Sequence, residues 1–223
     1  MNGQKNDNFK WFNPESSKEN LIEGQAWPKE VENYYGRLPL KAKIKVNSNI
    51  WKLGSQSSGL MIRFRSNSDE IKIRYQTKNK SYSLNHMPAT GASGVDLYAI
   101  DADGKKLWVS STFGRSFKDT IQYHYSRLKP NDNYNKFGRE YRLYLPLYNG
   151  IEWLEIGVKD NSDFSPLTKR KEKPIVVYGT SIAQGACASR PGMAWTSILS
   201  RRMDRPLINL GFDGNGKMHP EVI

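Results

Sequence analysis

The stretch PIVVYGTSIAQG, residues 174–185, decides the fold of the C-terminal part of this chain. It opens with a continuous apolar run, 175–178, which is typical of a strand buried on both faces of a parallel sheet. A loop follows, and Pro191 then suits the first turn of a helix. The helix is expected to carry one apolar stripe, formed by Trp195, Ile198, Leu199 and Met203. A second apolar strand, LINL at 207–210, completes a predicted βαβ unit with a right-handed connection.

Each of these two strands runs directly into a loop that contains glycine. The first loop is GTSIAQG at 179–185, and the second is GFDGNG at 211–216. In open parallel sheets, ligands bind at the carboxyl ends of the strands. The two loops should therefore open side by side, and the sequence predicts the functional site between them.

Upstream, the apolar residues follow a period of two. Apolar and charged or polar residues alternate in the runs 41–46, 60–65, 71–76 and 153–158. Such alternation indicates antiparallel strands that cover a core on one face. Asp103-Gly104 provides a turn between two further runs, at 95–100 and 106–111. Many short strands without a recognisable helix between them predict a β-sandwich of jelly-roll type.

The chain is therefore divided into four parts. They are an N-terminal arm at 1–35, a β-sandwich at 36–160, a polar and charged solvated linker at 161–173, and the start of an α/β domain at 174–223. Residues 112–138 form a polar and aromatic insertion to which the sequence assigns no structure.

The composition excludes several classes of function. There are 34 Lys and Arg against 22 Asp and Glu, a net charge of +12 that would attract acidic partners. The charges are spread along the strands and no nucleic-acid motif accompanies them, so no nucleic-acid partner is expected. No run approaches the ~20 apolar residues of a membrane span, so no membrane partner is expected. The single cysteine, Cys187, excludes an intramolecular disulfide. His86, His124 and His219 are scattered, so neither a metal nor another cofactor is predicted.

The first residues lack the apolar segment of a signal peptide. The compartment is left open: secreted or periplasmic if an export signal was removed, and otherwise cytoplasmic.

Two common motifs fit the loops poorly. Residues 211–217 match the phosphate-binding pattern G-x-x-x-x-G-K, but Met218 stands where that motif needs Ser or Thr to hold magnesium. Residues 179–183 lack the second glycine of the α/β-hydrolase nucleophile elbow.

A third interpretation accounts for both loops. VYGTSIAQG at 177–185 resembles the first conserved block of the SGNH (GDSL-type) hydrolases, with Gly-Thr-Ser in place of Gly-Asp-Ser, and 209–216 resembles their second block. SGVDLY at 93–98 is similar to the Gly-x-Asp-Leu-Tyr signature of a β-sandwich domain that precedes the catalytic domain in one branch of this family. Residues 188–193 also fit that branch. The resemblance implies an α/β three-layer domain after residue 174.

The same resemblance implies a mechanism. Ser181 would be the nucleophile that forms an acyl-enzyme, and the backbone N–H groups of Ser181 and Gly214 would donate to the oxyanion. Each such donor is typically worth about 2.7–4 kcal/mol of transition-state stabilisation. The alternative for Ser181 is a hydroxyl that caps the following helix. For Gly214 it is a tight turn, which does not exclude the catalytic role.

The resemblance stops before the family's third-block Asn and its Asp-x-x-His, neither of which occurs in this sequence. His219 follows the second loop and is not expected to replace that base. We therefore expect an N-terminal fragment of a serine esterase that is inactive by itself, because the nucleophile lacks a general base.

The predicted substrate is a small-molecule or glycan acyl ester, with acetyl esters of carbohydrate as one case, and the oligomeric state is left open. The alternative is a non-catalytic β-sandwich that binds carbohydrate through tyrosines such as Tyr123, Tyr125 and Tyr134. Those tyrosines are equally explained by core packing.

Overall fold

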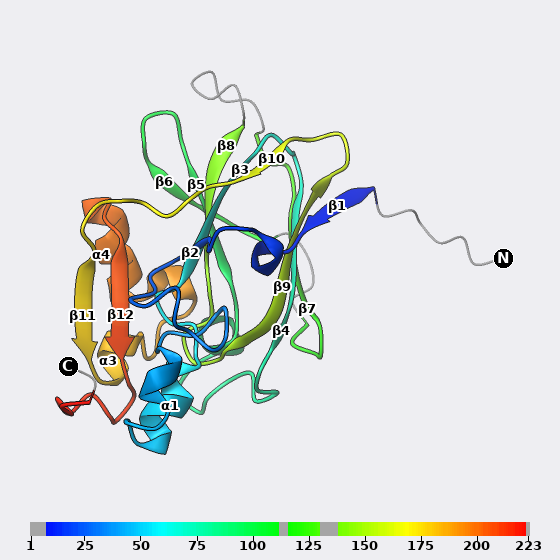
Figure 1. Ribbon diagram of the computed structural model, residues 1–223. Coiled ribbons are helices and arrows are strands. Elements are labelled where there is room, and N and C mark those ends of the chain that lie inside the picture. Colours follow the sequence, from blue (N-terminus) through cyan, green and yellow to red (C-terminus); the bar gives the residue numbers. More distant parts are fainter. Residues whose placement is uncertain (1–7, 112–115, 130–137, 222–223) are drawn as a thin grey trace.

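The computed structural model describes residues 8–111, 116–129 and 138–221. Two antiparallel sheets pack against each other, and a pair of parallel strands with two helices lies at one side of them (Figure 1). The described part of the chain is thus mostly sheet, as the sequence predicts. No helix within it is long and apolar enough to cross a membrane.

The first sheet has the strand order β1-β9-β4-β7. Its strands are β1 (Phe9–Phe12), β9 (Ile151–Lys159), β4 (Ile71–Thr77) and β7 (Ile121–Tyr125). The second sheet has the order β10-β3-β8-β5-β6, with β2 also paired to β3. Its strands are β10 (Phe164–Pro166), β3 (Met61–Ser66), β8 (Arg139–Tyr144), β5 (Asp96–Ile100), β6 (Lys106–Val109) and β2 (Ile22–Glu23). We call these two sheets together the two-sheet body.

Apolar residues that alternate along the strands fill the space between the two sheets. Ile71, Ile73 and Tyr75 of β4 are fully buried, and so are Ile62 and Phe64 of β3. This confirms the strands predicted from alternation at 60–65, 71–76 and 153–158. The turn at Asp103-Gly104 is also confirmed, since it joins β5 to β6 with Gly104 at φ +80°.

The strand expected from the alternation at 41–46 is absent. The chain forms a short 3₁₀-helix, η2 (Leu40–Ala42), a turn, and the helix α1 (Ser48–Gly54). Ala42 and Val46 are buried while Ile44 is 91% exposed, so the buried residues follow an i, i+4 spacing. The amides of Lys45 and Val46 both bond to the carbonyl of Ala42, which closes a helical turn. Because Asn47 caps the Ile50 amide, α1 begins immediately afterwards.

Two further regions differ from the sequence expectations. The strand β7 lies in the unassigned stretch 112–138, and its Tyr123 and Tyr125 are buried in the core. Tyr134 lies outside the described residues. In the stretch read as a solvated linker, β10 pairs with β3, and Arg170 forms a buried ion pair with Glu23 of β2 at 2.5 Å. The charged run therefore contributes an interior contact.

The C-terminal unit has the predicted βαβ order. Strands β11 (Ile175–Gly179) and β12 (Leu207–Gly211) are parallel, and between them come α3 (Ser181–Gln184), the 3₁₀-helix η3 (Pro191–Met193) and α4 (Trp195–Met203). Val176 of β11 is 58% exposed, so this strand is not buried on both faces.

The helix α4 does not bury its predicted apolar stripe. Its buried residues are Thr196, Ser197 and Ser200, whereas Trp195 and Met203 are exposed. The buried face is polar because it lies against polar groups, among them the Asn209 amide, which is 3.3 Å from the Thr196 hydroxyl. Short hydroxyl side chains also allow the helix to approach the neighbouring strands closely.

The N-terminal part of the chain covers the other face of β12. In Figure 1, this segment and α1 lie between the two-sheet body and the β11–β12 pair. Leu38, Ala42 and Ile50 form one hydrophobic cluster with Leu210 and Phe212. The remaining short elements of the structure are the 3₁₀-helix η1 (Pro14–Ser16) and the helix α2 (Ala89–Ala92).

Candidate functional site

The two glycine loops lie side by side at the ends of β11 and β12. Gly179 pairs with Gly211 in the parallel register, and the amide of Phe212 donates to the Gly179 carbonyl at 2.8 Å. A Cβ atom on Gly216 would overlap the backbone of Gly179 and Thr180. The loop that follows β12 is therefore in direct contact with the loop that leads to Ser181, as the sequence predicts.

Ser181 is the first residue of α3, two positions after the end of β11, and is half-buried. Among the described residues, its hydroxyl has no hydrogen-bond partner, and the helix has no side-chain cap. The capping role that the sequence left open is therefore not used here. A hydroxyl at a strand end with no local bond remains available for chemistry.

Gly214 occupies the tip of the second loop. Its φ is +63°, in the left-handed region that favours glycine, and it is exposed. A Cβ atom built there would meet nothing within 4 Å. Glycine is thus favoured at this position for its backbone conformation, and a substrate could approach the open space beside it.

Two buried amide side chains brace both loops. The Gln184 carbonyl oxygen accepts the amide N–H of Asp213 at 3.0 Å, and its NH₂ donates to the Leu147 carbonyl at 3.1 Å. The Asn209 side chain donates to the Ala183 carbonyl at 2.8 Å and accepts from the Gly211 amide at 2.8 Å. Each amide side chain therefore ties α3 to the loop that carries Gly214.

A buried arginine holds the end of β12 from the opposite side. Arg37 is 1% exposed, and its guanidinium donates to the carbonyls of Asn209 and Gly211 at 2.9 and 2.8 Å. It also donates to the carbonyls of Leu53 and Gln56 at 2.7 and 2.9 Å. Burial lowers the pKa of Arg37 to about 9, since no carboxylate among the described residues pairs with it.

The two-sheet body contributes a contact to the nucleophile segment. Tyr148, which follows β8, donates its hydroxyl to the main-chain carbonyl of Ser181 at 3.3 Å. Burial raises the pKa of this phenol well above its usual range, and the charges of Asp213 and Cys187 add to the effect. Tyr148 therefore acts as a neutral hydrogen-bond donor.

No general base is in place for Ser181 within the described residues, since no histidine or carboxylate bonds to its hydroxyl. His219 lies beyond the second loop, as expected, and is partly exposed there without a hydrogen bond to any described residue. Among the residues that the structure covers, no group of His, Cys, Asp and Glu could hold a metal ion.

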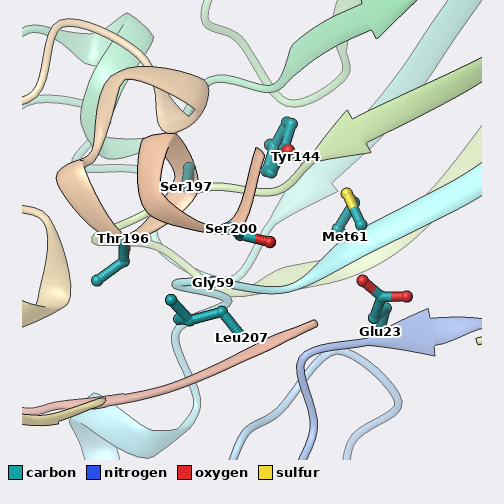
Figure 2. Close-up of a pocket in the computed structure, with 8 residues that line it drawn as sticks. All are labelled: Glu23, Gly59, Met61, Tyr144, Thr196, Ser197, Ser200 and Leu207. Atoms are coloured by element: carbon teal, nitrogen blue, oxygen red, sulfur yellow. The ribbon is translucent and has the colours of Figure 1, made fainter. Parts of the chain in front are cut away.

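The small cavity between the two-sheet body and α4 is not the site. Figure 2 shows it between β2, β3 and α4, with the Glu23 carboxylate and the Ser200 hydroxyl directed into it. Its volume of about 10 Å³ for the centre of a water molecule leaves room for one water at most. Leu207, which lines it, begins β12, whereas Ser181 and Gly214 follow the other ends of the strands. The cavity therefore belongs to the seam between the two parts of the chain.

Comparison with known proteins divides the chain in the same way. Residues 9–164 match the family described as GxDLY, the N-terminus of SGNH-hydrolase-type esterases. Residues 172–223 match the GDSL-like lipase/acylhydrolase family. By these matches, a β-rich N-terminal part is followed by a segment similar to the GDSL-like lipases and acylhydrolases. More particularly, the chain belongs to the SGNH-hydrolase-type esterases that carry a GxDLY N-terminus.

Two solved structures are similar to the chain. One is a candidate GDSL-like lipase from Bacteroides ovatus, 34% identical, with a TM-score of 0.82; the chain covers 60% of it, and 96% of the chain is matched. The other is the salicylyl-acyltransferase SsfX3 from a tetracycline biosynthetic pathway, 18% identical, with a TM-score of 0.63; the chain covers 57% of it, again with 96% of the chain matched. The second likeness shows the fold alone. Among curated proteins, none matches the chain.

Proposed function

We propose that this chain carries the nucleophile and two oxyanion donors of a serine esterase that acts on small acyl esters. The observation that supports this best is the junction of the two loops. Ser181 follows the end of β11 with its hydroxyl unbonded, and the loop packed against it places Gly214 at φ +63° beside open space. Membership of the esterase family supports an acyl hydrolase-type activity.

In the proposed reaction, the Ser181 oxygen attacks the ester carbonyl while its proton passes to a general base. The carbonyl oxygen becomes an oxyanion, which accepts hydrogen bonds from the backbone N–H groups of Ser181 and Gly214. Collapse of this intermediate expels the alcohol, which takes up the proton, and leaves an acyl group on Ser181. Water then attacks the acyl-enzyme in the same way and releases the acid.

The loop contacts suit this chemistry because they fix the donors before substrate arrives. The buried Gln184 and Asn209 side chains tie the first loop to the second, and Arg37 holds the carbonyls at the end of β12. Preorganised donors need no rearrangement during the reaction, which is how an oxyanion hole lowers the barrier.

The proposal also concerns the domains. The two-sheet body is a β-sandwich accessory domain, and β11–β12 with its helices is the start of a three-layer α/β domain. The related structures extend beyond the part that this chain matches, since it covers 60% and 57% of them. We place the general base in that further part. Acetyl esters of carbohydrate are the proposed substrate.

The test is hydrolysis of p-nitrophenyl acetate by the 223-residue chain and by a longer protein that includes the base. The chain alone should show no turnover. In the longer protein, Ser181→Ala should lower kcat by about a thousand-fold or more, since the nucleophile is lost. Ser165→Ala is the matched control, because Ser165 is an exposed serine of β10, outside both loops. Full activity in Ser181→Ala would refute the proposal.

A further inference from the structure

Two side chains of the Gly-x-Asp-Leu-Tyr motif at 94–98 lie on the outer face of their sheet, where solvent is expected. Within β5, Leu97 points into the core between the two sheets, so Asp96 and Tyr98 point away from it. Such outward positions of an antiparallel sheet are normally solvated. Asp96 is nevertheless only 3% exposed, and Tyr98 is buried as well. Something other than the core must therefore cover them.

The cover is the segment that joins α3 to α4. Asp96 accepts the amide N–H of Gly192 at 3.0 Å and forms an ion pair with Arg190 at 3.1 Å. It also accepts from the indole of Trp108 at 2.7 Å, and the Arg190 guanidinium lies 4.1 Å from the centre of that indole ring. One carboxylate thus joins the two-sheet body to the backbone and to a side chain of the α/β unit.

Tyr98 makes a second contact with the α/β unit, through an arginine of α4. The Arg201 guanidinium of α4 stacks over its ring at 4.0 Å and donates to the Gly192 carbonyl at 2.6 Å. A Cβ atom on Gly192 would overlap both Tyr98 and Asp96. Glycine at 192 therefore allows the backbone to lie directly on the motif.

The glycine of the motif, Gly94, supports contacts to the first residues of the stretch 188–192. A Cβ atom on Gly94 would overlap the carbonyl of Thr90, so Gly94 allows α2 to lie close to β5. From there, the Thr90 hydroxyl donates to the Ser189 carbonyl at 2.7 Å, and Gly91 packs on the carbonyl of Ala188. Three of the four defining residues of the motif, Gly94, Asp96 and Tyr98, therefore support contacts to the stretch 188–192 or to α4.

We infer that Asp96 is a positioning residue for the proposed active site, and that the motif is a seat for residues 188–192. The seat fixes the chain between α3, which begins at Ser181, and α4, and so restrains the C-terminal end of α3. The part of this inference that concerns catalysis rests on the proposed function. The seat itself rests only on the contacts.

The first test is hydrogen–deuterium exchange on the 223-residue chain, read by mass spectrometry. In Asp96→Ala, exchange of the amides at 186–194 should accelerate at least ten-fold, while β4 and β9 keep their protection. Asp96→Asn keeps the size of the side chain and an oxygen for Trp108, so its effect should be smaller. Asp160→Asn is the control, since Asp160 is exposed and its carboxylate contacts no described residue.

Two further variants reach the seat without changing Asp96, in case Asp96→Ala does not fold. Gly192→Ala should force the segment away from Tyr98, and Thr90→Val should remove one hydrogen bond to Ser189. Both should accelerate exchange at 186–194 selectively. Unchanged exchange there, or an increase spread evenly over every strand, would overturn the seat.

The second test separates the seat from the proposed function. In the longer protein, Asp96→Asn should lower kcat at least five-fold with little change in KM, because it disturbs the nucleophile segment and leaves substrate contacts in place. Equal kcat in Asp96→Asn and wild type would overturn the positioning role. If Ser181→Ala stays active while exchange at 186–194 responds as expected, the proposed function fails and the seat stands.

Discussion

In the two-sheet body, side chains such as Phe64 and Ile73 are completely buried, whereas Val176 and Met203 of the β11–β12 unit are more than half exposed. The buried residues of α4 carry hydroxyl groups, and the carboxyl end of the neighbouring strand β12 is held by the Arg37 guanidinium and by the side-chain amides of Gln184 and Asn209. The body is thus stabilised mainly by burial of apolar surface, whereas the α/β unit combines one apolar cluster on β12 with directed polar contacts at its loops. Directed hydrogen bonds position loops accurately, but removing one donor leaves a buried acceptor unpaired and lowers the free energy of unfolding.

The largest effect should come from removing Arg37, the arginine that joins α1 and the residue Gln56 to β12. Arg37→Ala leaves four main-chain carbonyls without their donor and should lower the free energy of unfolding by about 4 kcal/mol. Denaturant unfolding followed by hydrogen exchange is the measurement. The β11–β12 unit should open before the two-sheet body does. A single transition in which both parts unfold together would break the comparison.

A smaller loss is expected from the amide that connects the loops. Gln184→Ala removes the acceptor of the Asp213 amide and a donor to the Leu147 carbonyl, in an interior with no exposed surface. The free energy of unfolding should fall by about 2–3 kcal/mol. Amide exchange at 211–216 should accelerate in the same variant. Protection there equal to wild type would show that the loop is held by other contacts.

For comparison with these variants of the α/β unit, one methyl group is removed from the apolar core of the two-sheet body. Ile73→Val should lower the free energy of unfolding by about 1 kcal/mol, the usual cost of this truncation. Because the core lies between the two sheets, exchange in β4 and β9 should rise together while the loops at 179–185 keep their protection. Selective loss of protection in those loops would contradict the division of the molecule.

The free energy of unfolding should depend on pH through the Asp96 carboxyl group of the seat. Burial raises the pKa of Asp96 to about 6, although the charges of Arg190 and Arg201 oppose the rise. The folded state therefore holds this proton more tightly than the unfolded state, so stability falls as the pH rises from about 4 to about 6 and then levels off. The difference between wild type and Asp96→Asn, measured from pH 4.5 to 7.5, should follow that curve. A flat difference would contradict it.

The smallest effect is expected on the uncovered face of the parallel pair. Val176→Thr changes a side chain that is 58% exposed, so the free energy of unfolding should stay within about 0.5 kcal/mol of wild type. Thermal or denaturant unfolding is sufficient to measure it. A loss above about 2 kcal/mol would show that this face is covered in solution, since a buried position is costly to change.

The sequence predicted the parts of the fold that a local period determines. Strands β3, β4 and β9 alternate cleanly and were predicted, and so was the order of the βαβ unit. Residues 41–46 alternate too, but tertiary packing decided their structure, because Ala42 and Val46 pack with β12 and Ile44 packs with nothing. Alternation alone does not reveal whether a neighbouring strand is there to pair with.

The candidate site was predictable only in its loops. The apolar strands and the glycines located the two loops. The resemblance to the SGNH hydrolases then pointed to Ser181 and Gly214 within them, and the catalytic roles of both residues remain predictions. Gln184 lies inside the first recognised block, but its spacing gives no sign that it would bond to the second loop. Arg37 could not be found from local pattern, since its guanidinium meets Asn209 across 172 residues of sequence. Contacts of that separation leave no local trace in sequence.

The same separation has a consequence for biosynthesis. Residues 27–54 are made early, yet the strand that they cover, β12, follows some 172 residues after Arg37. At roughly 5–20 residues per second, a ribosome needs about 10–30 s to supply that partner. During this interval the two-sheet body can close, while the apolar side chains of residues 27–54 still lack their contacts with β12. The nascent chain therefore passes through a stage in which Ile50 and Leu38 lack Leu210 and Phe212 as partners, and the emergence of β12 ends that stage.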